Sequence, residues 1–92
     1  MRLSIIIVNE NNRQALRRCL ASLNRFCRRA EVIVVDNAST DDSAQMVYES
    51  FPHVVLCPLN HSHSAAAAVN VGLSFTRGQY IVLLDAEAAS YA

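Results

Sequence analysis

The chain of 92 residues has few of the residues that mark several common kinds of site. It contains two glycines, two prolines and three cysteines, with no tryptophan and no lysine. Two glycines cannot build a GxGxxG loop, and the lack of lysine excludes the GK[ST] phosphate loop. The cysteines, Cys19, Cys27 and Cys57, lack the CxxC spacing of zinc and redox sites. We therefore expect buried, reduced thiols in a cytoplasmic protein.

The chain also lacks net charge and long apolar runs. Its formal charge is zero, which argues against a nucleic-acid partner. The N-terminal apolar segment, Leu3 to Val8, is too short for a signal peptide or a transmembrane segment. We expect a cytoplasmic protein, with attachment to the inner face of the membrane as the alternative.

The positive charges are unevenly placed, because six of the eight arginines lie between Arg13 and Arg29. This pattern favours the solvated face of an amphipathic helix. A surface for phosphates or anionic lipid headgroups is the alternative.

Apolar periodicity predicts strands that alternate with helices. Val32 to Val35 is a continuous branched aliphatic run, typical of a strand buried on both faces. Alternation of strands and helices specifies a parallel sheet covered on both faces. We predict an α/β fold in one domain over residues 1–92: a three-layer αβα arrangement with a mainly parallel four-stranded sheet. The expected strands are 3–8, 32–36, 53–57 and 80–84, and the expected helices are 13–26, 43–50 and 64–76.

Polar side chains follow the carboxyl end of every predicted strand. Loops are often polar, but two of these strands end at a lone acid directly after an aliphatic run. In open α/β sheets the carboxyl edge is where ligands bind. We therefore predict a ligand site there, formed by Asn9 with Glu10, Asp36 with Asn37, Asn60 with His61, and Asp85 with Glu87.

The segment after Asp36 has the pattern of a helix start. Ser39 and Asp42 have capping-box spacing, and Thr40 is an equally good N-cap. Asn11 or Asn12 is expected to cap the first helix in the same way. Asp36 is thus predicted to lie just before a helix N-terminus, as an acceptor for a nucleotide base or ribose.

Two further groups of side chains have metal-binding chemistry. Asp85 and Glu87 are two residues apart and would face the same way in an extended segment, so both could reach one divalent cation. A solvated loop is the alternative. His61 and His63 could bind a transition metal, although exposed loop histidines are the favoured interpretation.

Four segments together resemble the N-terminal half of a family 2 glycosyltransferase with the Rossmann-like GT-A fold. They occur in the family order, and the resemblance runs from about residue 3 to residue 88. It implies that the chain binds a nucleotide-diphosphate sugar, typically of uridine type, with Mn²⁺ or Mg²⁺ held by Asp85 and Glu87. The segments are 4–11, 31–43, 70–73 and 78–87. The implied nucleotide-binding residues are Val8, Asn9, Asp36, Asn37 and Ser39.

The sequence also departs from the family pattern. Glu10 stands where an aromatic is usual, the segment 60–66 lacks the usual glycine and aromatic, and Glu87 replaces an aspartate. The 92 residues hold no acceptor-binding half and no credible general base, so we expect a truncated domain that binds the donor without being catalytically complete alone. The alternative is a non-catalytic interaction or oligomerisation module that has lost the ligand. An uncovered fourth strand predicts a homodimer or a larger protein partner.

Overall fold

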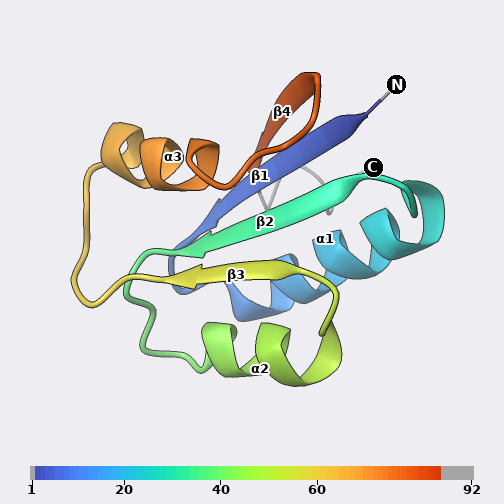
Figure 1. Cartoon of the computed structure of the whole chain (residues 1–92). Coiled ribbons are helices and arrows are strands. Elements are labelled where there is room, and N and C mark those ends of the chain that lie inside the picture. Colours follow the sequence, from blue (N-terminus) through green and yellow to red (C-terminus); the bar gives the residue numbers. More distant parts are fainter. Residues whose placement is uncertain (1, 86–92) are drawn as a thin grey trace.

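The computed structural model describes residues 2–85, in which four strands alternate with three helices (Figure 1). The order confirms the predicted one. The elements are β1 (Leu3–Asn9), α1 (Arg13–Phe26), β2 (Glu31–Asp36), α2 (Ser43–Ser50), β3 (Val55–Pro58), α3 (Ala65–Leu73) and β4 (Tyr80–Asp85).

Two predicted boundaries are wrong by two or three residues. β3 begins at Val55 rather than at residue 53, because the preceding residues form a turn in which the Val54 amide donates to the Phe51 carbonyl at 3.1 Å. α3 ends at Leu73 rather than at Thr76, because the chain tightens into turns that bond three residues back.

All strand pairs in the sheet are parallel, in the order β3-β2-β1-β4. β1 lies in the centre, between β2 and β4. In the register, Asn9 pairs with Asp36 across one side of β1, and Val8 pairs with Asp85 across the other. The sheet therefore places three of the predicted site residues, Asn9, Asp36 and Asp85, at its carboxyl edge.

The helices cover both faces of the sheet and confirm the three-layer αβα class. α1 and α2 lie on one face, and α3 lies on the other (Figure 1). Successive residues of β1 point to opposite faces, so Ile5 and Ile7 pack with the core beneath α1 and α2, whereas Ile6 packs with the core beneath α3.

The small residues of α3 let this helix approach the sheet closely. Ala68 and Gly72 are its buried residues. A Cβ placed on Gly72 would lie 2.7 Å from Ile6 Cγ2 and 3.2 Å from Val35 Cγ2. Small residues are therefore a packing requirement at these two positions.

β4 forms an exposed edge of the sheet. Four consecutive apolar residues, Tyr80 to Leu83, keep between 38% and 57% of their surface exposed. Within residues 2–85 no further strand pairs with its outer side. The apolar edge predicted at the fourth strand is present in the described part of the chain.

The thiols are free, as predicted. Cys19 and Cys57 are buried as predicted, but Cys27 is only half-buried, so the predicted burial is wrong for that thiol. Burial, together with the negative charge of Asp85, raises the pKa of Cys19 to about 11, and burial also raises the pKa of Cys57. In residues 2–85 no helix is both long enough and apolar enough to cross a membrane.

Candidate functional site

A buried hydrogen-bond network joins Asn9, Asp36 and Ser39 at the carboxyl edge. Asp36 Oδ1 accepts from Asn9 Nδ2 at 3.1 Å and from the Ser39 hydroxyl at 2.7 Å. Its other oxygen accepts from the Ser39 amide at 3.2 Å. Asn9 and Asp36 are both buried. The structure thus brings together three of the predicted nucleotide-binding residues, and the bonds from Ser39 show that Asp36 also shapes the loop after β2.

Asn9 contributes an acceptor that has no partner among the described residues. Its side chain is 1% exposed, and its Oδ1 atom makes no hydrogen bond within residues 2–85. The amide cannot simply be reversed, because its NH₂ group faces the Asp36 carboxylate. A buried polar atom of this kind is costly unless a ligand or water satisfies it. Asn9 Oδ1 is therefore a candidate contact for a ligand donor.

The predicted caps of the second helix, Ser39 and Thr40, are wrong. α2 begins at Ser43, and Asp42 occupies the N-cap position with a left-handed φ of 64° and no side-chain cap bond. The Ser39 hydroxyl is unavailable as a cap because it donates to Asp36 and accepts from the Asn11 amide at 2.9 Å.

Asp41 instead holds the N-termini of both α1 and α2, a role that the sequence reasoning missed. One carboxylate oxygen accepts from the Arg13 amide at 3.0 Å, and the other accepts from the Ser43 amide at 3.1 Å and from the Ser43 hydroxyl. Asn12 occupies the N-cap position of α1 without a side-chain cap bond. Burial alone would raise the pKa of Asp41, but the Ser43 hydroxyl and these two amides hold it below 3.8.

Asn37 ties the loop after β3 to the same edge. Its side chain pairs with the backbone of His63 in both directions: Nδ2 donates to the carbonyl at 3.0 Å, and Oδ1 accepts from the amide at 2.8 Å. Glu10 Oε1 accepts from Asn37 Nδ2 at 3.0 Å and from the Ser62 hydroxyl at 3.4 Å. Asn37 is buried, and the nucleotide contact predicted for it stays a prediction.

The two loop histidines stack on each other. The ring centroids of His61 and His63 are 4.4 Å apart with an interplanar angle of 6°, and His63 Nδ1 lies 2.8 Å from the His61 carbonyl oxygen. Residues 2–85 contain no group of three or more metal-ligating side chains. His61 is exposed and His63 is half-buried, and the interpretation of the pair as loop histidines stays a prediction.

Val8 and Asp85 complete the edge on the other side of β1. They are neighbours in the register, with Val8 packed against the core beneath α3 and Asp85 exposed at the end of β4. Glu87, the second predicted metal ligand, lies outside the described residues. The described edge therefore carries the Asp85 carboxylate at the end of β4 and, on the next two strands, the Asn9–Asp36 network.

Comparison with known proteins identifies relatives that carry out glycosyl transfer. The chain is 31% identical over 94 residues to the undecaprenyl-phosphate 4-deoxy-4-formamido-L-arabinose transferase of Klebsiella pneumoniae, an alignment that covers 94% of this chain and 29% of the relative. The corresponding protein of Salmonella paratyphi A is 28% identical over the same coverage. The chain thus spans less than a third of the length of these relatives.

Solved structures agree with the fold. The mannosyltransferase PcManGT from Pyrobaculum calidifontis, in complex with GDP-Man and Mn²⁺, superposes with a TM-score of 0.77 at 26% identity, covering 94% of this chain and 27% of that one. S. aureus TarS in complex with UDP-GlcNAc gives a TM-score of 0.81 at 26% identity, covering 95% and 27%. The sequence model of "Glycosyl transferase family 2" matches residues 4–89. As the resemblance predicted, this chain, with its GT-A-like fold, belongs to glycosyl transferase family 2.

Proposed function

We propose that the carboxyl edge of the sheet binds a nucleotide-diphosphate sugar, of uridine type, together with Mn²⁺ or Mg²⁺. The observation that carries this proposal is the buried, unpartnered Asn9 Oδ1 beside the Asp36 carboxylate. Asn9 Oδ1 accepts from one ligand donor, and the remaining lone pair of Asp36 accepts from the ring N–H of the base. Val8, Asn37 and Ser39, at the same edge, are proposed to contact the nucleotide as well. Two structural relatives support the choice of ligand, since one is a complex with GDP-Man and Mn²⁺ and the other is a complex with UDP-GlcNAc.

The donor chemistry of the edge fits a hard divalent cation. Asp85 supplies a carboxylate oxygen at the end of β4, and we propose that Glu87 supplies a second. Diphosphate oxygens and water would complete such a shell. When bound, the cation neutralises charge on the diphosphate.

Glu10 makes this binding depend on the cation. Its carboxylate lies at the same edge, 3.0 Å from Asn37 Nδ2. A second negative charge near the diphosphate repels it unless a cation intervenes. The nucleoside diphosphate should therefore bind weakly when the metal is removed.

The proposal is donor binding without complete transfer by this chain alone. Among the described acids at the edge, Asp36 accepts from Asn9 and Ser39, and Glu10 accepts from Asn37. Asp85 is assigned to the cation. We assign no general base within residues 2–85.

Substitutions test these assignments. Asp36→Asn keeps the shape of the side chain but removes its charge, so we expect it to weaken uridine diphosphate binding by about 1–3 kcal/mol. Asp85→Ala should abolish the dependence of binding on Mn²⁺, whereas Glu49→Ala, on the exposed face of α2, should leave it unchanged. Full Mn²⁺ dependence in the Asp85 variant would show that the metal assignment is wrong.

A second candidate function is an oligomerisation module, favoured by the exposed β4 edge. The Tyr80 amide donates to the Arg2 carbonyl at 3.1 Å, so the next peptide groups that face outward are those of Ile81 and Leu83. Arg77 and Asp85 give the two ends of this segment opposite charges. Antiparallel pairing of two copies would bring each arginine near the partner's aspartate.

Sedimentation velocity distinguishes this second candidate. We expect a dimer at micromolar concentration that Leu83→Lys converts to a monomer, because a charged side chain on an edge strand opposes pairing. The matched control is Tyr48→Lys, at an exposed aromatic on α2. A parent chain that sediments only as a monomer contradicts the candidate.

A further inference from the structure

The outward face of α1 carries a cluster of arginines. Leu16, Cys19, Leu20 and Leu23 form the buried stripe of the helix, together with Ala15. At 100° per residue, Arg17, Arg18 and Arg25 project from the side opposite that stripe, and all three are exposed. Arg18 and Arg25 are seven residues apart and therefore lie above one another. We call these three residues the arginine face.

No acid balances this charge along its own segment. Residues 11–30 contain six arginines and no aspartate or glutamate, although the whole chain has zero net charge. The acids of the molecule lie before and after this segment. The charge distribution along the chain is therefore asymmetric, and α1 has a positive surface that is complementary to an anionic partner.

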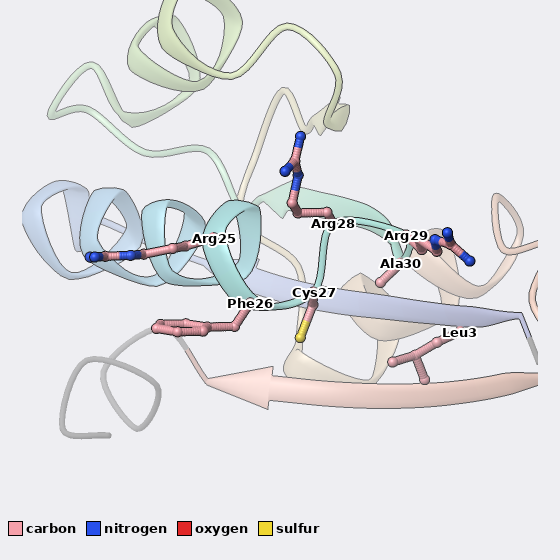
Figure 2. Close-up of a pocket in the computed structure, with 7 residues that line it drawn as sticks. All are labelled: Leu3, Arg25, Phe26, Cys27, Arg28, Arg29 and Ala30. Carbon is pink, nitrogen blue, oxygen red and sulfur yellow. The ribbon is translucent and has the colours of Figure 1, made fainter.

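An exposed aromatic follows Arg25 at the C-terminal end of α1, about 100° around the helix from it and on the side of the buried stripe. Phe26 keeps 77% of its surface exposed, and the Arg25 guanidinium carbon lies 5.7 Å from its ring centroid. Beside it is a hollow of about 430 Å³, lined by Leu3, Arg25, Phe26, Cys27, Arg28, Arg29 and Ala30. Figure 2 shows Phe26 at one end of this hollow, with Leu3 and Cys27 pointing into the space above β4.

We propose that the arginine face and Phe26 together dock this domain onto the surface of an anionic lipid bilayer. Arginines near such a surface each contribute attraction to the lipid headgroups, and an aromatic ring beside them inserts at the headgroup boundary. A nucleic-acid duplex would use the same positive charge. A duplex has no apolar region that Phe26 could enter at the end of the helix. A bilayer provides both anionic headgroups for the arginines and an apolar region for the ring, so we choose the bilayer as the partner.

This surface is separate from the proposed donor site. α1 begins just after Asn9, at the carboxyl edge, and its last turn lies against Leu3, at the start of β1. Phe26 is thus at the amino edge of the sheet. Bilayer docking through this end would leave the carboxyl edge open.

Vesicle co-sedimentation of the whole chain tests the proposal. The probes are vesicles of phosphatidylcholine alone and vesicles containing 30% phosphatidylglycerol. We expect binding to the anionic vesicles only, weakening as salt is raised. The triple variant Arg17→Gln, Arg18→Gln, Arg25→Gln should lower the partition coefficient about 100-fold, since each arginine contributes about fivefold.

Two pairs of variants distinguish the loss of this surface from the general effect of removing any exposed aromatic or any arginine. Phe26→Ser should reduce binding to anionic vesicles at least fivefold, whereas Tyr48→Ser, at a side chain that is 76% exposed on α2, should not. Arg25→Gln should reduce binding more than Arg77→Gln does. All these side chains are exposed, so circular dichroism should show the parent fold in each variant.

Three results would overturn the proposal. One is equal binding to neutral and anionic vesicles. Another is an equal loss of binding in the Phe26 and Tyr48 variants. The third is binding of a duplex DNA, abolished in the triple arginine variant, without vesicle binding, which would assign the face to nucleic acid.

Discussion

Replacing Asp36 with alanine should lower the stability of the fold as well as ligand affinity. The carboxylate is buried and accepts three hydrogen bonds, from Asn9 Nδ2, the Ser39 hydroxyl and the Ser39 amide. Hydrogen bonds to charged groups contribute about 1.5–3 kcal/mol each, and an orphaned buried donor costs about 1–3 kcal/mol. These terms are not additive. Alanine also removes the cost of burying a charge, which offsets part of the loss. We therefore expect Asp36→Ala to lower the free energy of unfolding by about 3 kcal/mol.

That loss is large for a chain of this size. At about 0.05–0.15 kcal/mol per residue, 92 residues give about 5–14 kcal/mol in total. Urea denaturation measures the effect. With a slope of about 1.5 kcal/mol per molar, the midpoint should fall by about 2 M.

Glu49→Ala is the matched control for this prediction. Glu49 is an exposed acid that accepts from Gln45 Nε2 at 3.0 Å and from no other side chain within residues 2–85, and its removal should change stability by less than about 0.5 kcal/mol. Equal midpoints for the two variants would refute the reasoning, because the Asp36 carboxylate would then contribute nothing to the loop.

Three further perturbations follow from the structure. Asp41→Ala should destabilise the chain by about 2 kcal/mol, because it removes a cap of about 1 kcal/mol from each of the two helices α1 and α2. Because the pKa of Asp41 is lowered, the stability that its carboxylate contributes is present above pH 3.8 and is lost as the pH falls through the folded pKa. Urea denaturation at a series of acidic pH values should show this loss of stability in the parent chain but not in the Asp41→Ala variant. Gly78→Ala should reduce the melting temperature strongly, since its Cβ would lie 2.7 Å from the Ser4 backbone nitrogen and 3.0 Å from the Leu3 carbonyl carbon. Cys19 has a pKa raised from 9.0 to about 11, so about 3 kcal/mol of stability should be lost between pH 9 and pH 11, and Cys19→Ala should flatten that part of the profile.

The fold could be predicted because its elements are specified locally. The aliphatic run from Val32 to Val35 predicts a strand buried on both faces, and the structure buries all four residues. The spacing of Leu16, Cys19, Leu20 and Leu23 predicts the buried stripe of α1, which the structure also contains. Strand and helix periodicities need only neighbouring residues, which explains why the element order was correct.

The caps could not be predicted, because they depend on segments far apart in the chain. Ser39, Thr40 and Asp42 all have the chemistry of an N-cap, yet none caps α2 with its side chain. Asp41 has this role because the fold brings the N-termini of α1 and α2 together, and its bond to Arg13 spans 28 residues. No local pattern distinguishes Asp41 from its neighbours.

The candidate site was predicted in position but not in detail. Topology alone places Asn9, Asp36 and Asp85 at one edge. The sequence did not indicate that Asp36 bonds to Asn9 and Ser39, or that Asn37 pairs with the backbone of His63, 26 residues away. These contacts depend on loop geometry, which hydrophobic periodicity does not encode.

Titration calorimetry with uridine diphosphate, in the presence and absence of Mn²⁺, tests the proposed donor site most directly. The proposal predicts binding that requires Mn²⁺ and that weakens in the Asp36→Asn variant. Heat of binding that is absent in both conditions would contradict it and favour the oligomerisation module.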